Sequence, residues 1–248
     1  MIKRSIYFTI LMLVTTSTYG EKILINLGKD CQAAWRLKQF NLRHVAYPFD
    51  WLRTYDFEGV IRCIAENFQC FLTAEDLVHI GYGVKNKRYG MEFVHDFPTV
   101  GSHSNYVAVE NENAGTVITR YRDYLPQIHN KYDARIHRFL DVLVSSDEVI
   151  FIRTHIKPRE AQKFVAMMAR HYPHLHYTLL VVHQYKDLRC DWNIPHVMSA
   201  YVEKPDLSNQ NRWWHETEWH DIFAKLNVIS EASQNRSPMK SWDVSEID

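Results

Sequence analysis

The stretch 148–183 constrains the fold more than any other part of the sequence. Residues 148–153 (EVIFIR) and 176–183 (HYTLLVVH) are short apolar runs rich in β-branched residues, which is typical of strands buried on both faces. Between them, residues 157–172 place apolar side chains at helical spacing, with Pro158 suited to a first helical turn. Strand, helix and strand at this length predict a βαβ unit, and therefore a parallel sheet.

Other segments extend this pattern. Residues 22–27 (KILINL) predict a strand that ends at Gly28, followed by a helix that Asp30 can cap, and residues 197–202 predict a further strand. Additional helices are expected at 56–71, at 121–144 (as one helix or two) and at 213–226, with a short strand at 92–97. The fold class expected from the residues is α/β, with a mostly parallel central sheet flanked by helices in three Rossmann-like layers.

The first 20 residues differ from the rest of the chain. Lys3 and Arg4 are followed by a run of about ten apolar residues and then by small or polar residues up to Gly20, which is the layout of a cleaved secretory signal peptide. The run is too short to span a bilayer, which takes about 20 helical residues. We therefore expect a signal peptide at 1–20, one α/β domain at 21–229 and a polar tail at 230–248, in a secreted or periplasmic protein with no stable membrane span.

Charge and cysteine content limit the possible functions. Lys plus Arg and Asp plus Glu each number 29, so no charge excess points to nucleic acid as a partner. Four cysteines are present, and an exported protein could pair them. Cys63 and Cys70 lie on one predicted helix at a separation of roughly 10 Å, whereas a bridge needs less than about 7 Å. No bridge is therefore expected between them unless the helix ends in the interval.

Cys31 is the residue that most suggests chemistry. It follows a predicted strand and a glycine turn, and it opens a helix. The free N–H groups and partial positive charge of a helix start favour a thiolate and can hold an oxyanion. The neighbouring Asp30 opposes this effect, because a carboxylate disfavours a second negative charge. The alternative is a small cysteine that only packs in the turn.

A thiol nucleophile needs a base, and His95 is the candidate in the glycine-rich middle of the chain. The adjacent Asp96 would point to the opposite face of a strand, so it need not orient the imidazole. Asp50, between Phe49 and Trp51, could orient a histidine or a substrate amine, or could simply bond to backbone N–H groups of its own turn. His95 could equally be a plain surface or core residue.

Other chemistries find less support in the sequence. The histidines at 171, 174, 176, 215 and 220 lack the i, i+4 spacing of a helical zinc pair, and no phosphate-loop or dinucleotide motif occurs. We expect no metal and no cofactor. Ligands of parallel sheets sit beyond the carboxyl ends of the strands, where His155 and His183 join Cys31. The tryptophans Trp213, Trp214 and Trp219 indicate core packing more than a sugar-binding platform.

Several motifs taken together resemble a known family. The stretch 26–32 (NLGKDCQ), the element 48–51 (PFDW) and the later HDF at 95–97 are similar to a bacterial family described as "putative papain-like cysteine peptidase". Arg135 and Arg138 on a helix and FIR at 151–153 continue the similarity, which covers roughly residues 22–185. The resemblance implies Cys31 as nucleophile and His95 as its partner, with Asp96 and Asp50 as alternatives for the third role. It also implies a papain-like α+β fold as the alternative to a parallel sheet.

The sequence therefore predicts an exported cysteine-dependent hydrolase or acyltransferase that acts on a peptide, acyl or glycan substrate. A non-catalytic domain that binds a ligand or carbohydrate is the alternative, with Arg153, Asp50 and the tryptophans as contacts. A carbohydrate-modifying transferase is a third reading, but it would need a nucleotide-sugar site that the sequence does not reveal.

Overall fold

The computed structural model describes residues 22–100, 115–183, 191–202 and 216–229. Within these ranges the chain is a mixed α/β structure with one parallel and one antiparallel sheet, each of four strands, and five α-helices. None of the described helices is both long and apolar enough to cross a bilayer. The expectations for the leader at 1–20, the tail at 230–248, Cys190 and the pair Trp213 and Trp214 fall outside the described residues.

The parallel sheet contains all four of the longer strands predicted from the sequence. Its order is β1 (Ile23–Asn26), β6 (Glu148–Thr154), β7 (His176–His183) and β8 (Val197–Tyr201), and every neighbouring pair is parallel. The helix α4 (Pro158–His171) connects β6 to β7 and begins at the predicted proline. The order of the described strands follows the sequence without the reversal found in a doubly wound sheet. The parallel sheet is thus confirmed, whereas a Rossmann-like fold is not.

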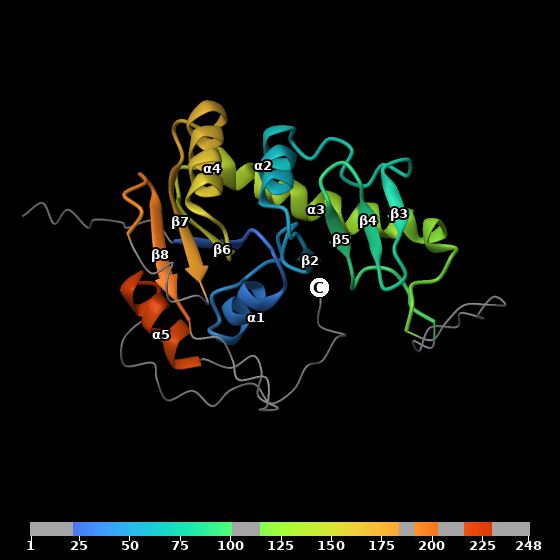
Figure 1. Ribbon diagram of the computed structural model, residues 1–248, viewed down its shortest axis with the longest axis horizontal. Helices are drawn as coiled ribbons and strands as arrows, with labels where there is room; N and C mark the ends of the chain where they lie inside the picture. Colours follow the sequence, from blue (N-terminus) through green and yellow to red (C-terminus); the bar gives the residue numbers. More distant parts are fainter. Residues whose placement is uncertain (1–21, 101–114, 184–190, 203–215, 230–248) are drawn as a thin grey trace, which may run out of the picture.

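Alternation along the strands separates two cores. Val149 and Phe151 of β6 point into the larger core, while Ile150 and Ile152 point into a smaller core. The helices α2 (Phe57–Ala65), α3 (Leu125–Leu143) and α4 cover the larger core. The helices α1 (Gln32–Gln39) and α5 (Glu216–Lys225) cover that smaller core (Figure 1). Burial on both faces explains why β6 and β7 are continuous apolar runs in the sequence.

The antiparallel sheet is the main feature that the sequence analysis missed. Its order is β2 (Leu52–Arg53), β5 (Met91–Phe93), β4 (Val84–Asn86) and β3 (Leu77–His79). The strand expected at 92–97 is correct only in its first residues, because β5 ends at Phe93. The inward side chains of this sheet join the larger core. The short helix η1 (Tyr121–Tyr124) and α3 (Leu125–Leu143) fill the segment predicted as one helix or two, and α3 runs along both sheets (Figure 1).

The helix α2 (Phe57–Ala65) is shorter than the predicted 56–71. It begins as expected, since the Asp56 carboxylate accepts a hydrogen bond from the Glu58 N–H at 3.0 Å. It ends early because the following residues Asn67, Phe68 and Cys70 take left-handed backbone conformations. Cys63 and Cys70 are free thiols, as predicted, although the helix does end between them.

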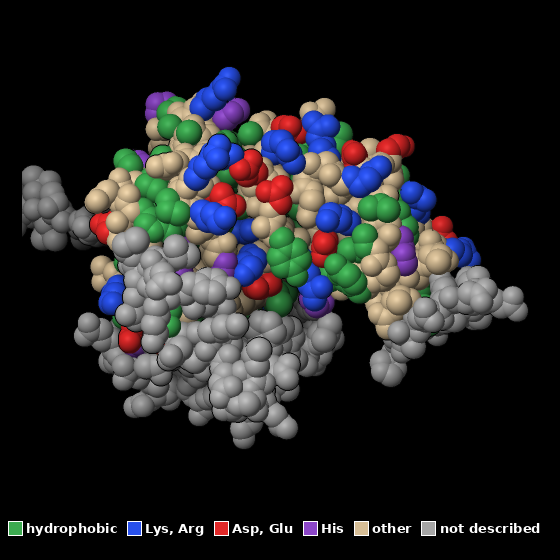
Figure 2. Space-filling view, viewed as in Figure 1, with side chains coloured by type: hydrophobic (Ala, Val, Ile, Leu, Met, Phe, Trp, Pro, Cys, Tyr) green, Lys and Arg blue, Asp and Glu red, His purple; other side chains and the backbone are tan. Residues whose placement is uncertain are grey.

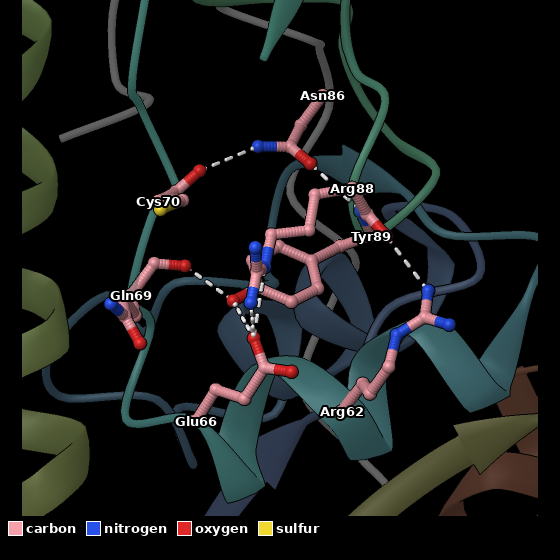
Figure 3. Close-up of polar contacts among 7 residues, drawn as sticks. All are labelled: Arg62, Glu66, Gln69, Cys70, Asn86, Arg88 and Tyr89. Atoms are coloured by element: carbon pink, nitrogen blue, oxygen red, sulfur yellow. Dashed lines mark hydrogen bonds and ion pairs between the residues drawn. The ribbon is translucent and has the colours of Figure 1, made fainter.

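Side chains connect the end of α2 to the turn between β4 and β5 (Figure 3). The Glu66 carboxylate accepts from the Arg88 guanidinium at 2.7 Å and from the Tyr89 hydroxyl at 2.7 Å. The Asn86 amide donates to the carbonyl oxygens of Cys70 and Phe71 at 2.9 and 3.0 Å. These contacts explain how the chain after α2, which has no regular structure, is held in one conformation.

Candidate active site

Cys31 occupies the position predicted for it, at the junction of β1 and α1. The chain leaves β1 through Gly28 and Lys29, both with positive φ of 82° and 74°, and Cys31 is the N-cap residue of α1. A Cβ atom at Gly28 would lie 2.3 Å from the Thr54 hydroxyl oxygen, so the turn has room only for glycine. Cys31 is half-buried, and its sulfur is therefore not sealed in the core.

The surroundings of Cys31 do not favour a thiolate. Burial, followed by the negative charge of Asp30, raises the pKa of Cys31 to about 11, while its own backbone N–H and the Arg53 charge oppose the rise. The Asp30 carboxylate also accepts the Gln32 N–H at 3.0 Å, which takes up one of the free donors at the helix start. Burial and the Asp30 charge thus outweigh the expected stabilisation of the thiolate by the helix start, and Cys31 is a neutral thiol at neutral pH.

Replacing Asp30 by asparagine should make Cys31 more reactive. The side-chain oxygen of the introduced asparagine can still accept the Gln32 N–H, while the like charge disappears. A fall of about one unit in the pKa of Cys31 would raise its thiolate fraction about tenfold. Because a less basic thiolate is a weaker nucleophile, the alkylation rate at pH 8 should rise about threefold. Mass spectrometry of the Cys31 peptide after timed iodoacetamide treatment measures this rate.

The substitution Asp133→Asn provides the control, because Asp133 is exposed on α3 and the same charge is removed there. It should leave the Cys31 rate unchanged. An Asp30→Asn protein that melts at the wild-type temperature but labels no faster at Cys31 would contradict the electrostatic account.

His95 follows β5 and is an exposed residue. Partial burial of its ring lowers the pKa of His95 below its usual value, and the charges of Arg53 and Lys131 lower it further, against the effect of Asp96. The imidazole is therefore neutral at neutral pH and can accept a proton. Within the described ranges, the structure shows no hydrogen bond between the Cys31 sulfur and an imidazole.

The two carboxylates considered for the third role contact other groups than the His95 ring. The Asp96 side chain is fully buried, accepts from the Tyr132 hydroxyl at 2.9 Å and lies 3.2 Å from the Lys131 ammonium nitrogen. Asp50 is also buried and accepts the Tyr47 N–H at 2.9 Å. It therefore bonds to a backbone N–H of its own turn, which was one of the two roles considered for it.

Asp50 also pairs with a cation. The Arg43 Nε lies 3.4 Å from the Asp50 carboxylate. Burial raises the pKa of Asp50 to about 6, although Arg43, the Tyr47 N–H and Arg135 each lower it. These contacts hold the carboxylate inside the turn.

The segment 46–54, which we call the PFDW loop, is fixed at several points. The Arg138 guanidinium donates to the Ala46 carbonyl at 3.0 Å, and the Asn26 amide donates to the Phe49 carbonyl at 3.5 Å. At its end, the Thr54 N–H donates to the Lys29 carbonyl at 3.0 Å, and the Lys29 N–H donates to the Thr54 hydroxyl at 2.7 Å. The loop thereby joins the Cys31 turn to the antiparallel sheet, because its strand β2 pairs with β5, the strand that precedes His95.

Arg153, at the carboxyl end of β6, completes this junction. Its guanidinium is buried, donates to the Leu27 carbonyl at 2.9 Å and to the Thr54 hydroxyl at 2.5 Å, and also bonds to the Thr54 carbonyl. It lies 4.8 Å from the centre of the Phe57 ring. Burial lowers the pKa of Arg153 to about 9, with Asp30 among the charges that oppose this. Arg153 therefore supports the turn from inside and is not exposed to a ligand.

Two other histidines, His155 and His183, lie at the carboxyl ends of the parallel strands. His155 follows β6, with a positive φ of 54° and a half-buried side chain. His183 ends β7, is fully buried beside the Trp192 ring, and has its pKa lowered to about 4 by burial. No group of three His, Cys, Asp or Glu side chains in the described ranges could hold a metal ion.

Sequence reasoning did not identify Arg53 and Thr54, which connect the candidate residues. Both come shortly after the PFDW element, separated from it by Leu52. A polar pair close behind an aromatic turn was the available signal, but the two-residue strand that contains Arg53 is too short to show a periodicity.

The comparisons with known proteins agree with the motifs. The family model described as "putative papain-like cysteine peptidase" matches residues 22–184. An uncharacterised protein of Acanthamoeba polyphaga mimivirus, R408, is 24% identical over 165 residues, which cover 58% of this chain and 66% of the relative, just under two thirds of its length. That relative is viral, so the expected restriction to bacteria is not confirmed. No solved structure matches the chain.

Proposed function

Because the chain belongs to the family described as "putative papain-like cysteine peptidase", we propose that it is a cysteine-dependent hydrolase with Cys31 as nucleophile. The observation that carries this proposal is the position of Cys31. Cys31 is half-buried where the PFDW loop, the end of β1 and the start of α1 meet. The NLGKDCQ and FIR elements of the family contact each other and the PFDW loop there.

The proposed chemistry begins from a neutral thiol and a neutral imidazole. The Cys31 sulfur attacks the acyl carbon of the substrate while its proton passes to His95, and the leaving group departs with that proton. Water then attacks the thioester, with His95 as general base, and releases the acid and the thiol. The pKa directions support this order, because a thiol with a raised pKa needs a base, and an imidazole with a lowered pKa can act as one.

This mechanism requires a hydrogen bond between the Cys31 thiol and the His95 ring, and the described residues do not make one. Catalytic hydrogen bonds are often long before substrate binds and shorten in the complex. His95 follows the end of β5 and is exposed, so its side chain has room to turn. The orienting carboxylate stays unassigned, since Asp96 and Asp50 both bond elsewhere.

Replacing Cys31 by serine tests the proposal. With 4-nitrophenyl acetate, the wild type should release a burst of 4-nitrophenolate equal to one acyl group per chain, followed by slow turnover. Cys31→Ser should lose the burst, with turnover lowered at least about a hundredfold, because an alcohol is a far weaker nucleophile than a thiol at neutral pH. Intact-mass analysis should show one acetyl adduct on the wild type and none on the variant.

His95→Asn serves as the second variant. It should slow the burst while leaving the melting temperature unchanged, since the residue is exposed. Cys70→Ser is the matched control, because Cys70 is a half-buried free thiol of the same chain. A burst of equal size in Cys31→Ser and the wild type would refute the proposal.

A non-catalytic domain that binds a ligand or carbohydrate is the second candidate. The raised pKa of Cys31 favours it, because an inert thiol is what a purely structural cysteine would show. However, Arg153 and Asp50, its expected ligand contacts, bond to internal groups. Acyl transfer shares the first step with hydrolysis and would appear as a higher rate of thioester breakdown when an amine or alcohol acceptor is added.

A further inference from the structure

Arg53 differs from the other arginines around the candidate site. Arg138 and Arg153 donate hydrogen bonds to internal carbonyl groups, and Arg43 pairs with Asp50. The half-exposed Arg53 guanidinium instead lies 5.3 Å from the centre of the Tyr82 ring, and it has no hydrogen bond or ion pair with the described residues. None of its five N–H donors is therefore used by a described residue, and the guanidinium can bind a ligand.

The strand pairing places Arg53 between the two candidate catalytic residues. On one side, its neighbour Thr54 is bonded to Lys29, two residues before Cys31. On the other side, Arg53 pairs with Glu92 across β2 and β5, and β5 leads to His95. The positive charge of Arg53 lowers the pKa of both Cys31 and His95, which agrees with a position close to each of them.

The side chains next to Arg53 form an aromatic surface, and the acidic side chain on it, Glu92, already has partners. Tyr82 and Tyr55 are 48% and 61% exposed. The Glu92 carboxylate, opposite Arg53, accepts from the Tyr82 hydroxyl at 2.9 Å and lies 3.6 Å from the Lys85 ammonium nitrogen. Near β2 and β5, the space-filling view shows hydrophobic, basic and acidic side chains next to one another (Figure 2).

We propose that Arg53 binds a carboxylate of the substrate, so that the site prefers acyl compounds with a negatively charged group, such as acidic peptides. A guanidinium presents two parallel N–H groups that match the two oxygens of a carboxylate. Tyr55 and Tyr82 provide apolar contact for the chain that carries this group. The inference that the bound group belongs to a substrate rests on the proposed hydrolase function. The preference for anions does not, because it is a property of the surface near Cys31.

Two alkylating reagents that differ by one charge test the inference. Iodoacetate is an anion and iodoacetamide is neutral, and both react with the Cys31 thiolate. The ratio of their rates at the Cys31 peptide, divided by the same ratio for N-acetylcysteine, cancels differences in thiolate fraction. Arg53→Gln should lower this normalised ratio on the order of threefold, the effect of one unit charge at about 7 Å in water. In the wild type, about 0.5 M NaCl should reduce the ratio toward that of the variant.

Lys87→Gln is the matched control, because Lys87 is exposed directly after β4 of the same sheet and its removal leaves the contact between Lys85 and Glu92 intact. It should leave the ratio close to that of the wild type. A ratio that is unchanged in Arg53→Gln, or that falls equally in Lys87→Gln, would overturn the inference.

A second measurement compares hydrolysis of 4-nitrophenyl acetate with that of 4-nitrophenyl hydrogen succinate, whose acyl group carries a carboxylate. The wild type should prefer the succinate ester in kcat/KM, and Arg53→Gln should lose this preference. The two proposals can fail separately. Alkylation of Cys31 that depends on Arg53 without any ester hydrolysis would refute the enzyme and keep the anion site. Hydrolysis that depends on Cys31 but shows no charge preference would refute only the role of Arg53.

Discussion

Replacing Arg153 by leucine is expected to lower the free energy of unfolding by about 3 kcal/mol. The guanidinium donates to the Leu27 and Thr54 carbonyl groups and to the Thr54 hydroxyl, all in the interior. A leucine removes a donor from all three acceptors. The Thr54 hydroxyl keeps the Lys29 N–H and the Leu27 carbonyl keeps the Thr54 hydroxyl, but the Thr54 carbonyl loses its donor, and a buried unsatisfied group costs about 1–3 kcal/mol. Since a domain is stable by only about 5–15 kcal/mol, the loss should be plain in urea denaturation followed by circular dichroism.

Two further variants separate the loss of the hydrogen bonds from the loss of a positive charge. Arg153→Lys keeps a charge but cannot reach both carbonyl groups with a planar fork, so it should fall between wild type and leucine. Arg159→Gln removes an exposed arginine from the first turn of α4, and it should change stability by less than about 0.5 kcal/mol. A leucine variant as stable as the wild type would mean that burial of the charge costs as much as its hydrogen bonds contribute.

Replacing Gly59 by alanine is expected to lower the free energy of unfolding by about 2 kcal/mol, although alanine is the better helix former. Gly59 lies in α2, and a Cβ atom there would lie 1.9 Å from the Tyr89 carbonyl oxygen. That oxygen belongs to the backbone, which the contacts between Glu66, Arg88 and Tyr89 hold against the helix (Figure 3). Overpacking of this kind costs about 1–3 kcal/mol.

Whether Gly59→Ala raises or lowers stability distinguishes close packing of α2 from simple helix propensity. In a helix free of neighbours, Gly→Ala stabilises by about 1 kcal/mol, so a gain in stability would contradict the close packing of α2 on the β4–β5 turn. Asp133→Ala, at an exposed position of α3, controls for the effect of a new helical alanine. Thermal unfolding of the three proteins side by side gives the comparison.

The parallel sheet could be predicted because its strands are buried on both faces. Residues such as Ile150 and Ile152 contact one core while Val149 and Phe151 contact the other, so the whole segment is apolar. The antiparallel sheet could not be predicted in the same way, since its strands have only two or three residues. A period of two cannot be recognised over so short a length.

The sequence supplied candidate residues for the site, but not the contacts that connect their segments. Motif resemblance pointed to Cys31 and His95, and the structure connects their segments through the PFDW loop and β2. The pKa of Cys31 is raised, whereas the helix start was expected to lower it. That expectation left out the cost of burying a thiolate. Whether a carboxylate bonds a histidine or a backbone N–H depends on long-range packing, which is why Asp50 and Asp96 stayed alternatives.

The pairing of β1 has a consequence for the order of events during protein synthesis. The partner of Ile23 is Val149, and the Leu27 N–H donates to the Ile152 carbonyl at 2.8 Å. Contacts between segments so distant along the chain form slowly, because a long loop must close first. The ribosome therefore completes most of the chain before the first strand has a partner, and the Cys31 turn acquires its final geometry only after β6 has been made.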